Sequence, residues 1–111
     1  MALLPEDLKF LREALRSFIE SAIQRVAHSG GMEYRFRLPA DDIKRETHRQ
    51  RIYGGVVADY EEYFHHHNVA ASFNEKFAAF EVDVDLARCV LDQNQSEQLS
   101  AAMSLFRSEH G

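Results

Sequence analysis

The stretch AAFEVDVDL, residues 78–86, decides the fold of this 111-residue chain. Its apolar and charged residues alternate, which places Phe80, Val82 and Val84 on one face of a strand and the carboxylates on the other. The stretch MEYRFRL, residues 32–38, alternates in the same way. Both segments therefore predict strands of a sheet that has one face against a core and the other face in water.

Two segments near the chain ends have the three-to-four residue spacing of amphipathic helices. Residues 5–28 form the longer one, with Pro5 suited to its first turn and a glycine pair at 30–31 suited to its end. Residues 95–109 form the other, and Asn94 with Glu97 resembles a capping box at its start. The apolar stripe of the first helix consists of Leu8, Leu11, Leu15, Phe18, Ile19, Ala22, Ile23 and Val26.

The middle of the chain contributes shorter elements. Residues 41–51 follow Pro39 and favour a helix, residues 55–67 fit either a helix or a strand, and residues 69–73 fit a short strand. The order of elements predicts one α+β domain over residues 1–111. We expect its small antiparallel sheet to pack against the long N-terminal helix and the C-terminal helix.

The composition excludes several classes of protein. A hydrophobic fraction of 45% and an aromatic fraction of 11% exceed what a disordered chain contains. No apolar run approaches the roughly 18 residues that a membrane span needs. The N-terminus does not have the pattern of a secretory signal either. The single cysteine, Cys89, can form no internal disulfide and favours a reducing, cytoplasmic location.

Basic residues are concentrated in the first half of the chain. Residues 1–51 contain ten Lys and Arg against eight Asp and Glu, whereas residues 52–111 contain three against ten. Phosphate contacts by Lys and Arg supply most of the affinity for nucleic acid, so the segment 35–51 is a candidate nucleic-acid-binding site. Its basic residues are Arg35, Arg37, Lys44, Arg45, Arg49 and Arg51.

A second interpretation pairs these charges within the chain. If strands 32–38 and 78–86 are neighbours, Arg35 and Arg37 face the carboxylates of the other strand. That pairing removes the free positive field, and the net charge of −5 with a pI of about 5.6 points the same way. We therefore expect nucleic acid to be a less favoured partner than protein.

The acidic second half suits a basic protein partner, because complementary charge speeds encounter and rejects wrong partners. The carboxylates at 81, 83 and 85 could instead hold a divalent cation, although a solvated sheet face explains them more simply. The long helix, residues 5–28, could join two copies of the chain in a homodimer. The residues that we expect to bind the partner are Asp59, Glu61, Glu62, Glu81, Asp83 and Asp85.

A run of three histidines is the other unusual feature. His65, His66 and His67 follow Glu61 and Glu62, and a carboxylate and an imidazole four residues apart on a helix can share a metal ion. Consecutive histidines point in different directions, however, and no HExxH or CxxC motif accompanies them. We expect exposed imidazoles at a helix end and no cofactor, and keep a small metal-dependent enzyme as an alternative.

The potential nucleophiles do not have the context that catalysis needs. Cys89 lies beside Val90 and Leu91, as a buried hydrophobic residue does, and Ser100 and Ser104 have no GxSxG turn. The sequence therefore predicts a small non-enzymatic intracellular protein, a regulator, inhibitor or complex subunit, that acts through protein–protein contact.

Overall fold

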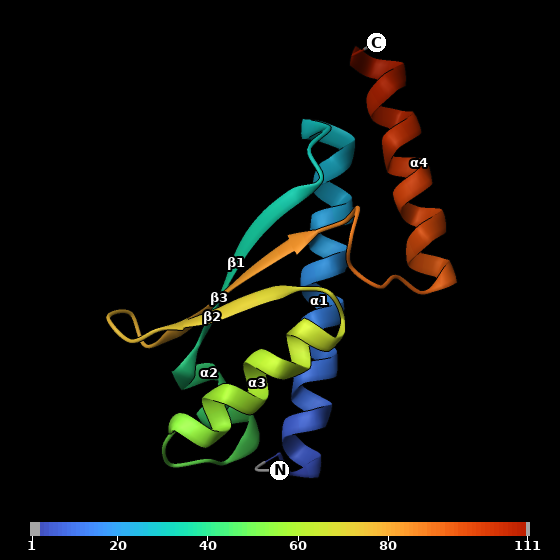
Figure 1. The fold of residues 1–111 in the computed structure, drawn as a ribbon. Helices are drawn as coiled ribbons and strands as arrows, with labels where there is room; N and C mark the ends of the chain where they lie inside the picture. Colours follow the sequence, from blue (N-terminus) through green and yellow to red (C-terminus); the bar gives the residue numbers. More distant parts are fainter. Residues whose placement is uncertain (1–2, 111) are drawn as a thin grey trace.

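The two alternating segments pair with each other at the centre of the fold (Figure 1). The computed structural model describes residues 3–110. In it β1 (Glu33–Pro39) and β3 (Ala79–Asp85) run antiparallel, with Arg35 opposite Asp83. β2 (Ala70–Asn74) pairs with the other side of β3, so that the strand order is β1-β3-β2. This small antiparallel sheet and its helices confirm the predicted α+β fold.

The long N-terminal helix, α1 (Pro5–Ser29), has a buried stripe that differs from the predicted one at its start. Leu11 and Leu15 pack into the core, but Leu8 is 41% exposed. Asp7 takes its place, because Asp7, Leu11 and Leu15 are four residues apart and lie on one face of the helix. The helix ends at Gly30, whose left-handed backbone (φ 73°) directs its N–H back to a carbonyl of the last turn.

One face of the sheet builds the core. Phe36 of β1 stacks on Phe18 of α1 with ring centroids 4.9 Å apart, and Phe80 of β3 stacks on Tyr60 at 5.7 Å. Tyr60 belongs to α3 (Gly54–His66), so α1 and α3 pack against the same face. The opposite face carries the charged residues of β1 and β3 and stays open to solvent, since the Arg35 side chain is 66% exposed.

The segment between β1 and β2 is helical, but less of it than predicted. α2 (Ala40–Thr47) ends four residues before the predicted limit at position 51, where His48 takes a left-handed backbone (φ 61°). The prediction is wrong there because Ile43 anchors α2 in the core, and Arg49 beyond it turns inward to bind Asp7 instead of continuing the helix. Residues 55–67 form the helix α3 rather than a strand, and residues 69–73 correspond to β2.

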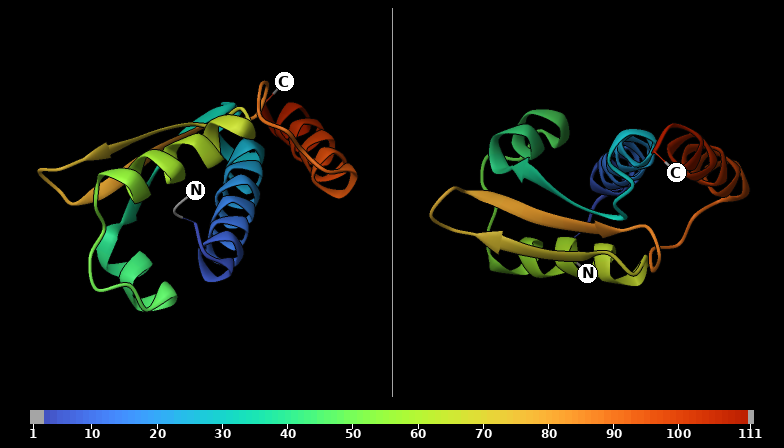
Figure 2. Two further views of the ribbon diagram at one scale, coloured as in Figure 1. Left: turned by 60° about the horizontal axis from the view of Figure 1, so that its bottom comes forward. Right: turned by 90° about the horizontal axis from the view of Figure 1, so that it is seen from above.

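The C-terminal helix, α4 (Gln93–His110), begins two residues earlier than predicted. The Asp92 carboxylate accepts the backbone N–H of Gln95 at 2.7 Å, and the Gln95 side chain accepts the N–H of Asp92 at 3.1 Å. This capping box has the same three-residue spacing as the predicted pair of Asn94 and Glu97, displaced by two residues. α4 then lies beside the C-terminal half of α1 (Figure 2).

Candidate functional site

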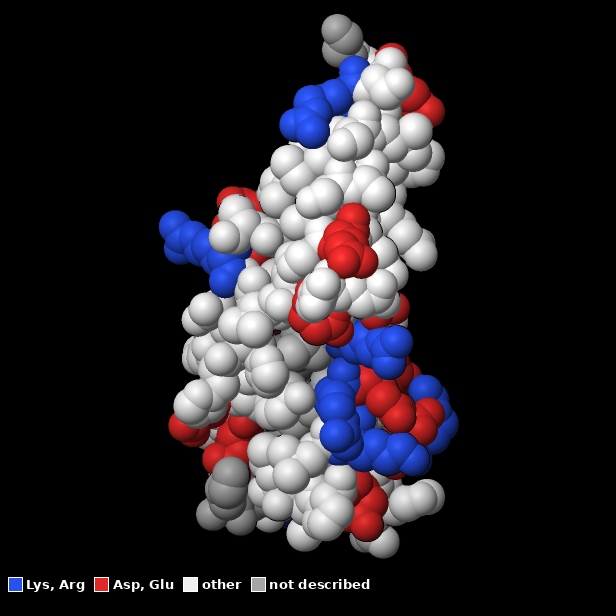
Figure 3. All heavy atoms as spheres, turned by 90° about the vertical axis from the view of Figure 1, so that its right-hand side faces the viewer, with Lys and Arg blue, Asp and Glu red and all other residues white. Residues whose placement is uncertain are grey.

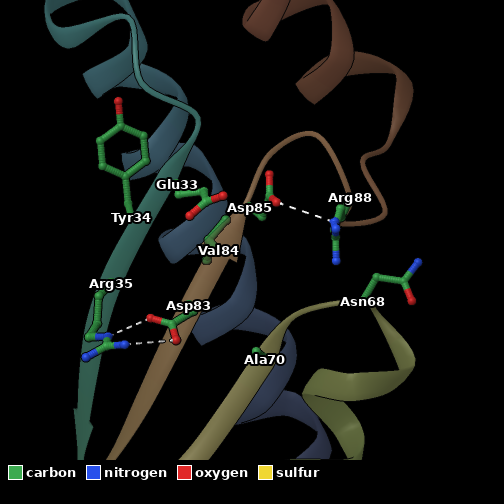
Figure 4. Close-up of a pocket in the computed structure, with 9 residues that line it drawn as sticks. All are labelled: Glu33, Tyr34, Arg35, Asn68, Ala70, Asp83, Val84, Asp85 and Arg88. Carbon is green, nitrogen blue, oxygen red and sulfur yellow. Dashed lines mark hydrogen bonds and ion pairs between the residues drawn. The ribbon is translucent and has the colours of Figure 1, made fainter.

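The open face of the sheet carries half of the predicted partner-binding residues. Glu81, Asp83 and Asp85 of β3 alternate along this face. Figure 4 shows Asp83 next to Arg35 of β1, with Asp85 further along β3. Arg35 donates from Nε to Asp83 at 2.7 Å and from Nη1 to Glu81 at 3.3 Å. The hydrogen bond to Asp83 raises the pKa of Arg35 above its ordinary value. The predicted cross-strand ion pairs of Arg35 are therefore confirmed, and they neutralise much of the carboxylate row.

A shallow hollow of about 560 Å³ lies on this face, between the start of β1, the end of β3 and the start of β2 (Figure 4). Asp85 accepts the backbone N–H of Ala87 at 3.0 Å and lies 3.7 Å from Arg88. Glu33 and Asn68 line the rim. Because charges of both signs alternate around it and are mostly paired, the hollow offers no field of one sign to a charged ligand.

The other three predicted partner-binding residues lie on α3, which packs against the opposite face of the sheet. Glu61 accepts the backbone N–H of Phe73 at 2.9 Å, so its carboxylate closes part of the outer edge of β2. Glu62 lies 3.4 Å from His66 one turn later. Asp59 lies next to Glu62 in a small cleft of about 150 Å³ between α3 and the start of α1. The structure therefore divides the six acidic residues between two sides of the molecule.

The predicted nucleic-acid site, residues 35–51, is spread over β1, α2 and the segment after it. Lys44 pairs with Asp41 at 3.3 Å and Arg45 with Asp42 at 2.9 Å, both within α2. The Arg37 guanidinium lies over the ring of Phe77 at 4.6 Å. Arg51 is exposed, and Arg49 is bound in the interior. The six basic residues do not form one continuous positive surface.

Asp7 is the centre of a buried polar network that the sequence did not reveal. Its side chain is fully buried and accepts four hydrogen bonds: from Arg49 Nε at 2.9 Å, Arg49 Nη2 at 2.6 Å, the Tyr60 hydroxyl at 2.7 Å and the Leu4 N–H at 2.8 Å. Burial alone raises the pKa of Asp7, but these hydrogen bonds outweigh burial and hold the pKa below its ordinary value. In the sequence, the burial of Asp7 was indicated only by its position four residues before Leu11 on the buried stripe of α1.

The same network sets the ionisation of its other members. The Asp7 carboxylate raises the pKa of Arg49, and burial together with Asp7 raises the pKa of Tyr60. Arg49 is therefore a cation, Asp7 an anion and Tyr60 a neutral donor near pH 7. The network joins α1, α3 and the segment after α2, and so it holds these three parts of the fold together.

The histidine run lies at the end of α3. His66 contacts Glu62, and the His67 ring lies 4.8 Å from the Tyr63 ring, while His65 is exposed. Within residues 3–110 no three His, Cys, Asp or Glu side chains are grouped as a metal site requires. His66 and Glu62 are neighbours that could share a metal ion, but none of the described residues supplies a third ligand beside them.

Cys89 is buried, as predicted. Burial raises the pKa of its thiol, with a further contribution from the nearby Asp85 carboxylate. A thiol in such surroundings stays protonated near pH 7 and is a poor nucleophile. Ser100 and Ser104 lie exposed on α4.

A groove between α1 and α4 is a further surface with the dimensions of a binding site. It has a volume of about 610 Å³, and Leu105 at its edge is 48% exposed. Figure 3, which faces this side, shows charged side chains to be sparse over the upper half, where α4 lies, and gathered lower down. The groove is lined by Glu20, Ile23, Gln24, Ala27 and His28 of α1 and by Gln98, Ala101, Ala102 and Leu105 of α4.

Comparison with known proteins identifies no relative: no family model matches the chain, and no curated protein or solved structure matches it significantly. Among the helices of residues 3–110, none combines the length and the apolarity needed to cross a lipid bilayer. The assignment of function therefore depends on the surfaces described above.

Proposed function

We propose that this chain is a small non-catalytic binding protein, a regulator, inhibitor or complex subunit, that binds another protein in the groove between α1 and α4. The observation that carries the proposal is an exposed groove with a single Asp, Glu, Lys or Arg among its described lining residues, on a protein whose residues are 28% charged. Charged residues are depleted at the centre of protein interfaces, and that centre is more apolar than the rest of the protein surface. The proposed setting is the cytoplasm, which suits the single reduced cysteine.

The composition of α4 supports this choice. Between residues 93 and 106 it contains one charged residue, Glu97, although much of the helix is exposed. Glu20 is the one Asp, Glu, Lys or Arg among the described residues that line the groove, which also include His28, and it is paired with Arg16 at 2.9 Å. An apolar partner can therefore enter without removing water from an unpaired charge.

The shape of the groove indicates the kind of partner. Two helices that lie side by side offer a channel into which a third helix packs at a distance of about 8–10 Å. An amphipathic helix with apolar residues three and four positions apart would place them against Ala101 and Leu105, which are four residues apart on α4. The predicted acidic residues are a less suitable contact, because Glu61, Glu81 and Asp83 already bind groups of their own chain.

Site-specific photo-cross-linking in cells tests the proposal. A benzophenone amino acid replacing Leu105 should form one dominant adduct with a different protein, and the same residue replacing Ser100 should not. Ser100 is the matched control because it is exposed on α4 but does not line the groove. Co-purification of the adduct partner with the unmodified chain should be lost in Leu105→Arg and kept in Ser100→Arg.

Three results would contradict the proposal. The first is equal labelling from the two positions, and the second is a partner that still binds Leu105→Arg. The third is an adduct only between two copies of this chain, which would make the groove a self-interface.

A further inference from the structure

β1 lies at the edge of the sheet and presents a row of backbone groups away from β3. The bonds that flank the β1–β3 ladder, Leu86 N–H to Met32 at 2.8 Å and Ala40 N–H to Ala78 at 2.8 Å, join even-numbered residues. Antiparallel ladders alternate bonded and non-bonded pairs, so the even residues of β1 bond to β3. The N–H and C=O groups of Glu33, Arg35 and Arg37 therefore point outward, as a strand edge that can accept another strand.

The charged residues of β1 differ in whether they form ion pairs. Arg35 is held by Asp83 and Glu81 of its own chain. Glu33 and Arg37, in contrast, take part in no ion pair among residues 3–110, although they have opposite signs and lie on the same open face. The Arg37 guanidinium contacts the Phe77 ring, at 4.6 Å. Glu33 and Arg37 are thus opposite in sign and free of ion pairs in the described part of the chain, but they are four residues apart on an extended strand and too distant to pair within one copy.

The other face of β1 carries aromatic rings that the chain covers only in part. Tyr34 and Phe36 are half-buried, although the next residue on this face, Leu38, is fully buried. Phe18 of α1 stacks on Phe36, and the Arg25 guanidinium lies over both strand rings, at 5.9 Å from Tyr34 and 5.2 Å from Phe36. An apolar row thus runs along the same edge that presents the outward backbone groups.

We propose that β1 pairs with β1 of a second copy of this chain, antiparallel and centred on Arg35, so that two three-stranded sheets join into one of six strands. A two-fold axis at Arg35 places Glu33 opposite Arg37 of the second copy, twice. On the core face it places Tyr34 opposite Phe36 of the second copy. The outward-pointing residues become the hydrogen-bonded pairs of the new ladder, as antiparallel geometry requires.

The neighbouring registers are worse matched. An axis at Tyr34 places Glu33 opposite Arg35, which Asp83 and Glu81 of its own chain already bind, leaves Arg37 opposite Gly31, and shortens the ladder. An axis at Phe36 places Arg35 opposite Arg37 twice and sets Glu33 against Pro39, which has no N–H to donate. In the register centred on Arg35 the one like-charge contact is Arg35 with itself, and each of these guanidinium groups already has two carboxylates of its own chain.

Charge reversal tests this register on the full chain. Light scattering should give twice the 12.8 kDa chain mass for the unmodified protein. Glu33→Arg or Arg37→Glu alone turns two attractive contacts into repulsive ones and should weaken dimerisation about tenfold or more. The two together restore opposite charges and should restore the dimer. Arg107→Glu, an exposed reversal on α4, is the matched control and should leave the dimer unchanged.

Disulfide trapping gives an independent readout. In a Cys89→Ala background, Arg35→Cys should cross-link two copies, because paired Cα atoms about 5.5 Å apart suit a disulfide. Arg37→Cys alone should not, whereas a mixture of Glu33→Cys and Arg37→Cys chains should. A protein that stays monomeric at all concentrations overturns the proposal. A dimer whose affinity is unchanged by the charge reversals also overturns it, because the contact would then lie elsewhere, for example along residues 5–28. A monomer leaves the proposed groove between α1 and α4 unaffected, whereas a contact along residues 5–28 would share its α1 residues and is separated from it by the cross-linking at Leu105.

Discussion

Replacement of Asp7 by asparagine should be among the most destabilising conservative changes in this protein. The Asp7 side chain is fully buried and Arg49 is 12% exposed, so water cannot replace the carboxylate once its charge is removed. The asparagine amide would also turn an N–H₂ group toward donors of Arg49, Tyr60 or Leu4. Removing one partner of a buried ion pair costs about 3–5 kcal/mol. For a domain of this size that corresponds to a fall in Tm of about 12–20 °C.

Urea unfolding followed by circular dichroism at pH 7 measures this cost, with Asp41→Asn as the matched control. Asp41 also pairs with a cation, Lys44, but its side chain is 90% exposed. Exposed pairs contribute little, so we expect the control to change the free energy of unfolding by less than about 0.5 kcal/mol. Equal losses in the two variants would refute the assignment of Asp7 as a buried anion.

The buried Asp7 carboxylate also makes the stability of the protein depend on pH. The folded-state pKa of Asp7 lies below its ordinary value, so its contribution to stability is complete above the unfolded pKa of about 3.9. That contribution decreases as the pH falls through the folded-state pKa. The difference between Asp7→Asn and the unmodified protein should therefore be largest near pH 7 and shrink below about pH 4. A difference that is independent of pH between 3 and 7 would contradict this sign.

Two further substitutions, each with a control, test the end of α1 and the start of α4. Gly30→Ala should destabilise the fold by about 2–4 kcal/mol, because Gly30 has a φ of 73° and an added Cβ would lie 2.5 Å from the Phe106 ring. Gly54→Ala, where nothing lies within 4 Å of the added Cβ, should be neutral within about 0.5 kcal/mol in the same thermal melts. Asp92→Ala should cost about 1 kcal/mol by removing the cap of α4, while Asn94→Ala should cost clearly less. Equal losses at 92 and 94 would favour the cap that the sequence predicted.

The parts of the fold that were predictable are those in which local spacing and tertiary structure agree. β1 and β3 alternate strictly, and the ion pair between Arg35 and Asp83 follows once the two strands are neighbours. The observed cap of α4 lies two residues before the predicted one, because Asp92 with Gln95 and Asn94 with Glu97 have the same capping-box spacing. Local spacing identifies such a motif but does not choose between two copies of it.

The parts that were not predictable depend on contacts between distant positions. Asp7 and Arg49 are 42 residues apart, and each had an adequate local explanation, one as a favourable charge in the first turn of a helix and the other as part of a basic segment. The division of the acidic residues likewise depends on which face of the sheet α3 covers. The alternation in β1 and β3 identifies the face that a helix covers, but residues 55–67 fitted a strand as well as a helix, so the sequence did not show that this segment covers it.

The two proposed surfaces reinforce each other because they involve different elements. The β1 edge uses backbone groups and the charges of Glu33 and Arg37, whereas the groove uses side chains of α1 and α4. Two-fold pairing through β1 would give one assembly with two identical grooves. A partner with two suitable helices would then bind both, and the second contact would form at the high effective concentration set by the first. Variants that abolish pairing through β1 should therefore weaken binding to a bivalent partner more than to a monovalent one.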